Sequence, residues 1–184
     1  LKPSQRFYLY SSIVNSPHSF ERVDSVASDC AKYGYQHGDT SPTGQLMAAK
    51  WNNNLCLIEG SGSFGSRMVQ SAAAPRYTHT RLHKNFNHYV KDLSLSPDHP
   101  DESHVPPMFY VPTIPLVLVN GVAGIATGFA TLILPRSVES IKSACIEYIN
   151  TGEIKKRIPI TFPVFNGRVV DNQDGSFVVY GSFK

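Results

Sequence analysis

The sequence predicts an α+β fold with a helix-turn-helix near its N-terminus and short strands in the rest of the chain. Residues 20–33 carry apolar side chains at spacings of three and four, which is the period of an amphipathic helix. Gly34 ends this helix, a polar turn follows, and residues 42–51 begin a second helix. Towards the C-terminus, residues 162–170 and 175–180 are apolar segments separated by an Asp-Gly turn, which is typical of a β-hairpin.

Shorter patterns predict the other elements of the first half. Pro3 suits the first turn of a helix that presents an aromatic face. The apolar run 55–58 predicts a buried strand that closes in a turn just after it. We expect residues 78–82 to begin a polar, partly helical segment, and residues 82–93 to form a helix.

The second half of the chain begins with a polar, proline-containing loop at residues 94–107. Residues 108–119 are apolar and interrupted by prolines, so we expect strand-like segments that end at an Asn-Gly turn. A glycine-containing stretch of small residues follows this turn. Ser137 then caps a helix over residues 138–149.

Composition limits the class of protein. The chain has 184 residues, of which 41% are hydrophobic and 17% charged, so it can form a packed core. A net charge of +3 and a pI of about 8.8 are compatible with a nucleic-acid partner but do not require one. Three scattered cysteines without CxxC spacing give no zinc site and favour a reducing, intracellular compartment. No apolar run is long enough for a membrane span, so we expect no membrane partner.

The candidate chemistry lies between residues 52 and 82, at the pair Arg76-Tyr77. The glycines and serines of residues 60–66 form a loop without bulk, which can approach a phosphate backbone closely. A phenol attacks poorly at neutral pH unless a cation or base assists it. A neighbouring guanidinium favours the phenolate and can grip phosphate oxygens, so the pair suits attack on a DNA phosphodiester. Alone, the dipeptide is more often an ordinary aromatic residue beside a surface charge.

Several motifs, in the same order, resemble the DNA breakage-reunion subunits of type IIA DNA topoisomerases. The active-site segment of that family is similar to GSGSFGSR at residues 60–67 and to SAAAPRYT at residues 71–78. Its H-G-[DE] signature matches residues 37–39, and its N-G-x-x-G-I-A-x-G segment matches residues 120–128. KWNNNL and HVPPMFYVPTIP are similar to the medium subunit of T-even-type phages. The resemblance covers nearly the whole chain.

The resemblance implies catalytic roles for Tyr77, Arg76 and His37. Tyr77 would form a transient 5′-phosphotyrosyl bond, Arg76 would stabilise the transition state, and His37 would donate to the phosphate or assist proton transfer. Ile133 aligns with an apolar wedge that bends the duplex by inserting between base pairs. The full set of expected DNA-binding residues is Lys2, Arg6, Gly38, Thr40, Ser63, Arg67 and Ile133.

The resemblance also implies an architecture and partners. Residues 1–136 would form a winged-helix DNA breakage-reunion domain, and residues 137–184 the beginning of a mixed α/β tower domain. The enzyme would be a homodimer that cuts double-stranded DNA, passes a second duplex through the break and reseals the first. ATP hydrolysis and Mg²⁺ would belong to an ATPase/TOPRIM partner subunit or region, because this chain has no Walker A motif and no D-x-D cluster. A phage-encoded form would act in the host cytoplasm or nucleoid.

Two other hypotheses remain open. A non-catalytic helix-turn-helix protein could bind or bend DNA, but it would need neither Arg76-Tyr77 nor the Gly/Ser loop. An enzyme unrelated to DNA could use the glycine-rich stretches to bind a small phosphate ligand. Single residues also have ordinary alternatives: Lys2 and Arg6 at a solvated helix start, Arg67 in solvent, and Ile133 in the core.

Overall fold

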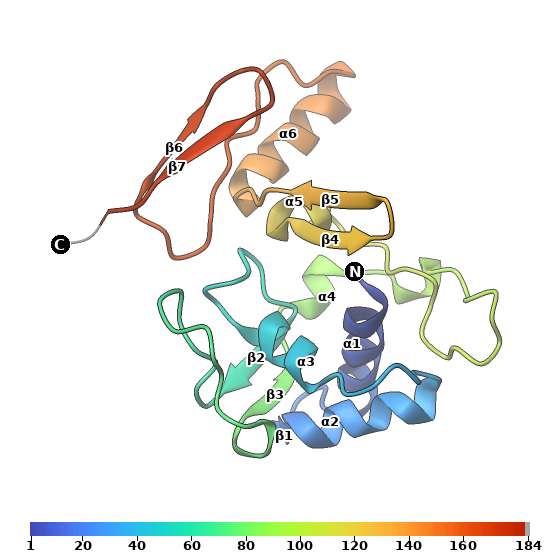
Figure 1. The fold of residues 1–184 in the computed structure, drawn as a ribbon. Coiled ribbons are helices and arrows are strands. Elements are labelled where there is room, and N and C mark those ends of the chain that lie inside the picture. Colours follow the sequence, from blue (N-terminus) through green and yellow to red (C-terminus); the bar gives the residue numbers. More distant parts are fainter. Residues whose placement is uncertain (183–184) are drawn as a thin grey trace.

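The structure is a computed structural model that describes residues 1–182, and it has the predicted α+β fold. A first group of elements surrounds α1, α2 and α3. A second group, which contains the β4–β5 and β6–β7 hairpins and helix α6, lies on one side of the first (Figure 1).

Three helices form the framework of the first group: α1 (Pro3–Asn15), α2 (Val23–Asp29) and α3 (Ser41–Ala48). A 3₁₀ turn, η1 (Cys30–Tyr33), continues α2 as far as Gly34. Gly34 has a φ of 98°, and a Cβ atom there would lie 2.0 Å from the carbonyl oxygen of Ser103. Only glycine therefore fits this turn. The predicted helix-turn-helix is confirmed, although its first helix begins three residues later than expected.

A three-stranded antiparallel sheet completes the first group. Its strands are β1 (Glu21–Arg22), β2 (Ile58–Ser61) and β3 (His79–Leu82), in the order β1-β3-β2. The pairing places Gly60 opposite Thr80 and Arg22 opposite His79. The chain order α1-β1-α2-α3-β2-β3, with the three strands in one antiparallel sheet, is the arrangement of a winged helix.

Two predictions in this region are wrong. The strand predicted at residues 55–58 begins only at Ile58 and continues past the expected turn. Residues 78–82, predicted to be partly helical, contain strand β3. Thr78 and Thr80 face the interior and are fully buried, and the Thr80 hydroxyl lies 2.7 Å from the Tyr8 hydroxyl. The buried side of β3 is therefore polar, and its hydroxyl group has a hydrogen-bond partner. The hydropathy of the sequence alone does not indicate a strand here.

The core of the first group packs α1 against α2, α3 and the sheet. Its largest fully buried side chains include Phe7, Tyr8, Leu9, Val23, Val26, Ile58 and Phe86. α3 approaches α1 closely at Gly44, where an added Cβ atom would lie 2.1 Å from the Tyr8 ring. The aromatic residues predicted to form one face of the first helix thus lie at the centre of the fold.

The connection between the two groups is mostly irregular. It contains α4 (Phe86–Tyr89), the 3₁₀ turn η3 (Leu93–Leu95), the predicted loop 94–107 and α5 (Leu116–Asn120). The helix predicted at 82–93 is reduced to the single turn α4. The strand-like segment predicted up to Val119 ends instead in α5, which follows Pro115 and buries Leu116 and Val119. That spacing of three fits a helix, and no strand of the described residues pairs with this segment.

The second group contains two hairpins and one long helix. Its elements are β4 (Val122–Ala126), β5 (Phe129–Ile133), α6 (Val138–Thr151), β6 (Arg168–Asp171) and β7 (Phe177–Tyr180). The Ser137 side chain accepts a hydrogen bond from the Ser140 amide, and Gly152 ends α6 with a φ of 76°. The predicted cap, the helix and the C-terminal hairpin are confirmed. The β4–β5 hairpin was not predicted, because its small residues show no alternation.

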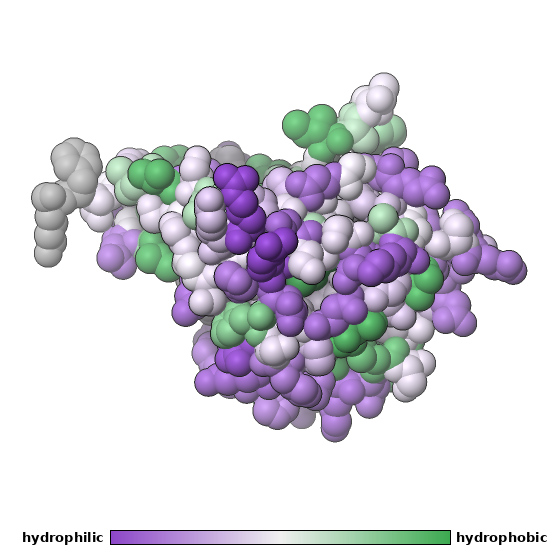
Figure 2. Space-filling view, turned by 90° about the horizontal axis from the view of Figure 1, so that it is seen from below, coloured by the Kyte–Doolittle hydropathy of each residue, from purple (hydrophilic) through white to green (hydrophobic). Residues whose placement is uncertain are grey.

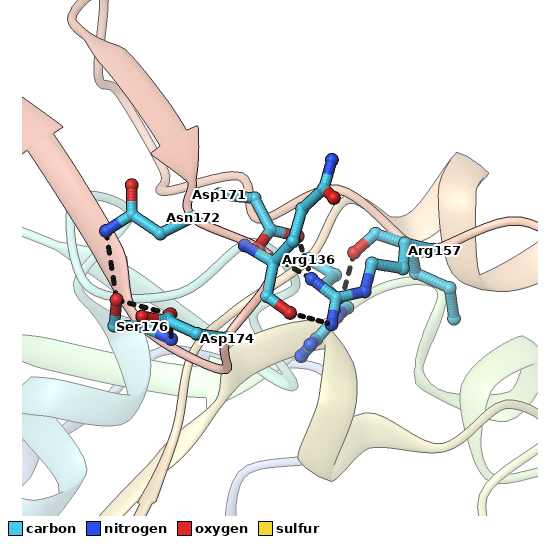
Figure 3. A network of polar contacts seen from close by, with 8 residues as sticks. Arg136, Arg157, Asp171, Asn172, Asp174 and Ser176 are labelled. Carbon is cyan, nitrogen blue, oxygen red and sulfur yellow. Dashed lines mark hydrogen bonds and ion pairs between the residues drawn. The ribbon is translucent and has the colours of Figure 1, made fainter.

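Polar contacts close the turn of the β6–β7 hairpin and attach the hairpin to the segment after α6. The Arg157 guanidinium donates to both carboxylate oxygens of Asp171 at 2.6 Å, and Asn172 donates to the Ser176 hydroxyl at 2.9 Å (Figure 3). Arg136 donates to the carbonyl oxygen of Ile158 at 3.3 Å. Arg157 thus has a structural partner.

Asn54 joins the first group to the second. Its side-chain amide donates to three backbone carbonyl oxygens, those of Val119 (3.1 Å), Arg136 (2.9 Å) and Thr161 (2.6 Å). Next to it, the Asn120 side chain accepts from the Leu55 amide at 2.9 Å and donates to the Leu55 carbonyl at 2.8 Å. The two asparagines therefore fix α5, the segment between β5 and α6, and the segment after α6 against the first group. The domain boundary expected after residue 136 stays a prediction.

Candidate functional site

Tyr77 lies at the surface, at the end of a 3₁₀ turn, η2 (Pro75–Tyr77). Its side chain is 65% exposed, and Arg76 is exposed beside it. The Arg76 guanidinium carbon lies 4.9 Å from the centroid of the Tyr77 ring. A phenol in this position is open to a large ligand and has a cation next to it.

Hydrogen bonds from neighbouring elements fix the turn that carries Tyr77. The Gln45 side chain, on α3, donates to the carbonyl oxygen of Ala73 at 2.7 Å and to the Thr78 hydroxyl at 3.1 Å. The Val23 amide, at the start of α2, donates to the Thr78 carbonyl oxygen at 3.0 Å. Both helices of the helix-turn-helix therefore hold this segment, residues 73–78, which we call the tyrosine turn.

The Gly/Ser loop lies beside the same turn. Gly62 has a φ of 115°, and a Cβ atom there would lie 3.3 Å from the carbonyl oxygen of Tyr77. The Ala73 amide donates to the Ser63 carbonyl at 3.0 Å, and the Trp51 indole donates to the Phe64 carbonyl at 2.9 Å. Ser63 is exposed. The structure thus brings together the two motifs that the sequence analysis linked.

The turn at residues 37–39 also comes close to the tyrosine turn. Gly38 and Asp39 line the same pocket as Ala74, Pro75 and Arg76, together with residues of α2. His37 is exposed, and its ring lies 5.9 Å from that of Tyr35. The structure places Gly38 beside Arg76 and leaves the His37 imidazole open to solvent.

Two of the residues expected to contact DNA are buried and have hydrogen-bond partners within the protein. Arg6 is only 6% exposed, and its guanidinium donates to the carbonyl oxygens of Pro106 and Pro107, the latter at 2.7 Å. Thr40 is 1% exposed, and its hydroxyl donates to the Ala27 carbonyl oxygen at 3.4 Å. Both polar groups therefore have partners within the protein, and their expected contacts with DNA stay predictions.

Lys2 and Arg67 differ in their surroundings. Lys2 is exposed at the start of α1. The Arg67 guanidinium donates to the carbonyl oxygens of Pro163 and Val164, and it lies 5.4 Å from the centroid of the Phe165 ring. Arg67 therefore holds the Gly/Ser loop against the second group.

The β4–β5 hairpin presents an apolar surface that the sequence analysis missed. Ile125 is 95% exposed, Phe129 80% and Leu132 72%, whereas Ile133 is half-buried opposite Val122. The strand register places Ile125 and Leu132 on one face of the hairpin and Phe129 on the other. Neighbouring exposed apolar side chains such as Ile125 and Leu132 often mark an interaction surface. The signal in the sequence was the position of Ile125 among glycines and alanines, where few neighbours can cover it.

Buried thiols near the site are structural. Cys30 lies beneath Thr40 with its sulfur 3.3 Å from that hydroxyl, and burial raises the pKa of the Cys30 thiol. Within residues 1–182, no three His, Cys, Asp or Glu side chains come together as ligands for a metal ion. No helix in the described part of the chain is both long and apolar enough to cross a membrane.

The face that carries α2 and β1 is predominantly hydrophilic. Figure 2 views the molecule from below Figure 1 and shows polar residues over most of this face, with separate hydrophobic patches between them. Such a surface suits a charged partner more than an apolar one.

Comparisons with known proteins agree on one family. Residues 1–183 match the family described as the A subunit of DNA gyrase/topoisomerase IV. The DNA topoisomerase medium subunit of Enterobacteria phage T4 is 45% identical over 188 residues, which cover 100% of this chain and 42% of that protein. DNA topoisomerase 2 of Acanthamoeba polyphaga mimivirus is 33% identical over 95% of this chain and 15% of its own length.

The crystal structure of the Plasmodium falciparum topoisomerase II DNA-binding, cleavage and re-ligation domain has a similar fold. It superposes with a TM-score of 0.89 and 27% identity, covering 97% of this chain and 26% of that chain. The chain thus spans less than half the length of each of these relatives.

Proposed function

Because the chain belongs to the family of DNA gyrase and topoisomerase IV A subunits, we propose that it is the DNA-cleaving and resealing part of a type II DNA topoisomerase, with Tyr77 as its nucleophile. The observation that carries this proposal is the exposed phenol of Tyr77 beside the Arg76 guanidinium, on a turn fixed by both helices of the helix-turn-helix.

The proposed reaction transfers a phosphodiester from DNA to the protein and back. The Tyr77 phenolate oxygen attacks a backbone phosphorus, and the bond from phosphorus to the 3′ oxygen breaks. The released 3′ oxygen takes up a proton, and the 5′ end stays joined to Tyr77. Arg76 stabilises the charge on the non-bridging oxygens, and His37 donates to the phosphate or moves the proton. The phosphotyrosyl ester retains the energy of the broken bond, so resealing is the reverse attack.

DNA binding would use groups from both parts of the structure. Lys2, Gly38 and Ser63 are exposed and suit contacts with the phosphate backbone. The family resemblance assigned the duplex-bending wedge to Ile133, but Ile125 is the more exposed of the two isoleucines on the β4–β5 hairpin. We therefore assign the wedge to Ile125.

The complete reaction needs partners. As the family resemblance implies, we assign the Mg²⁺ ligands to a TOPRIM region of a partner subunit. Mg²⁺ would supply charge neutralisation at the phosphate. ATP would be hydrolysed in the same partner. Two copies of this chain in a homodimer, acting inside the cell, would cut the two strands of double-stranded DNA.

Replacing the phenol tests the proposal. In the complete enzyme, assembled with its partner and Mg²⁺, Tyr77→Phe should abolish the covalent protein–DNA complex and leave DNA affinity nearly unchanged. Tyr148→Phe is the matched control, because Tyr148 is 58% exposed on α6. A covalent complex that survives Tyr77→Phe would refute the role of Tyr77. DNA binding without any covalent complex in the unmodified enzyme would favour a non-catalytic DNA-binding protein.

A second experiment tests the wedge. Ile125→Ala should reduce the bend of bound DNA, measured by energy transfer between dyes at the duplex ends. Ile133→Ala should leave the bend unchanged and mainly lower stability, because Ile133 is half-buried. The opposite pattern would return the wedge to Ile133.

A further inference from the structure

The tyrosine turn, residues 73–78, has little packing at its centre, although Thr78 at its end is buried. None of the three residues of η2 is buried, and the Tyr77 side chain is 65% exposed. Within the turn, the Tyr77 amide donates to the Ala74 carbonyl at 2.8 Å, which closes the turn but does not attach it to the domain. The position of the phenol therefore depends on hydrogen bonds from outside the turn.

Gln45 supplies two of these bonds from one nitrogen. Its Nε2 donates to the Ala73 carbonyl oxygen at 2.7 Å, before η2, and to the Thr78 hydroxyl at 3.1 Å, after it. Thr78 is fully buried, and its hydroxyl donates in turn to the Pro75 carbonyl oxygen at 3.3 Å. One side-chain amide thus bridges both ends of the turn.

We propose that Gln45 is a positioning residue for DNA cleavage, which holds the tyrosine turn against α3 so that the Tyr77 oxygen meets the phosphorus in line. The inference rests on the proposed function of Tyr77. Since Gln45 belongs to the second helix of the helix-turn-helix, the position of that helix on DNA is transmitted directly to the nucleophile.

The expected effect is on the chemical step, with binding unchanged. Gln45 is half-buried and does not need to contact DNA to act. A misplacement of about 1 Å can cost on the order of 100-fold in rate. Loosening the turn without removing it should cost less, so we expect covalent complex formation at saturating DNA to slow by about tenfold in Gln45→Met. Methionine has a similar length and helix propensity but donates no hydrogen bond.

The test uses the complete enzyme with its partner and Mg²⁺. The rate of covalent complex formation, the DNA dissociation constant and the melting temperature are measured for the unmodified enzyme, Gln45→Met and Thr78→Val. Thr78→Val removes the hydroxyl that accepts from Gln45 while keeping the side-chain shape. Gln70→Met, in the exposed loop of the same region, is the matched control. Tyr77→Phe provides the baseline without a nucleophile.

The proposal predicts a slower covalent step in both variants, with DNA affinity within about twofold of the unmodified enzyme. Both changes break the hydrogen bond between Gln45 and Thr78. The rate of covalent complex formation should therefore fall less in the double variant than the product of the two single-variant factors. Normal rates in both single variants would overturn the inference, as would losses explained entirely by weaker DNA binding. If Gln45→Met fails to fold, Thr78→Val decides the question alone. An unmodified enzyme that forms no complex at Tyr77 refutes the proposed function instead.

Discussion

Gly44→Ala is predicted to destabilise the protein, although alanine is the better helix former. Gly44 lies within α3, where it faces the buried ring of Tyr8. A Cβ atom at this position would lie 2.1, 2.3 and 2.6 Å from three atoms of that ring. The ring cannot move away easily, since Tyr8 is fully buried and its hydroxyl is bonded to Thr80.

Two opposing effects set the magnitude. The helix-forming advantage of alanine over glycine is about 1 kcal/mol. Overpacking a well-packed core costs roughly 1–3 kcal/mol, and three contacts this short place Gly44→Ala near the upper end. The free energy of unfolding should therefore fall by about 2 kcal/mol. For a chain of this length, that corresponds to a melting temperature lower by about 4–8 °C.

Thermal unfolding followed by circular dichroism measures this change. Gly124→Ala is the matched control, because nothing lies within 4 Å of an added Cβ atom there, and it should change stability by less than about 1 kcal/mol. The double variant Gly44→Ala/Tyr8→Leu should be less destabilised than the sum of its single changes. A melting temperature of Gly44→Ala at or above that of the unmodified protein would show that α1 and α3 do not pack as described.

Three further predictions concern single side chains. Asn54→Ala should lower the free energy of unfolding, measured by urea titration, by about 1–3 kcal/mol, because three carbonyl oxygens lose their donor. Asn52→Ala is the control and should lower it less, because it removes a single hydrogen bond of 3.4 Å. Burial acts to raise the pKa of Glu59, but hydrogen bonds from Arg81 and the Lys84 amide outweigh it and lower the pKa. Its contribution to stability is therefore present above the unfolded pKa of about 4.3 and is lost as the pH falls through the folded value. Glu59→Gln should accordingly lower the melting temperature at pH 7 and have less effect at acid pH, where Glu59 is protonated in the folded protein as well; an equal effect under both conditions would contradict this. Burial raises the pKa of the Cys56 thiol to about 11, so iodoacetamide at pH 8 should alkylate it much more slowly in the native protein than in urea; equal rates would show that the thiol is accessible.

The helix-turn-helix could be predicted because its signals are local. Apolar spacing marks the first helix, Gly34 marks its end, and Pro42 marks the start of the second. The Ser137 cap and the Gly152 stop of α6 are local in the same way. Where a residue's own neighbours in the sequence decide its conformation, pattern and structure agree.

Other features could not be predicted because they depend on polar side chains whose hydrogen-bond partners are distant in the sequence. β3 has an inward-facing threonine, Thr80, whose buried hydroxyl is satisfied by the distant Tyr8 hydroxyl. The internal partners of Arg6, the carbonyl oxygens of Pro106 and Pro107, could not be predicted either, because they lie 100 and 101 residues away in the sequence. Contacts of this range leave no periodic trace in a single sequence.

The candidate site shows the same division. The Arg76-Tyr77 pair and the Gly/Ser loop could be recognised as motifs, and the structure places them side by side. The bridge from Gln45 could not be recognised, because its acceptors lie 28 and 33 residues away. The exposure of Ile125 depends on which side of a hairpin remains uncovered, which only the fold decides.

The most direct measurement identifies the residue that carries DNA. The complete enzyme, with its partner and Mg²⁺, would be stopped on DNA with denaturant, digested with nuclease and protease, and analysed by mass spectrometry. The account predicts a nucleotide joined through its 5′ phosphate to the hydroxyl of Tyr77. Cleaved DNA whose 5′ ends are attached to another residue, or are free of protein, would contradict it.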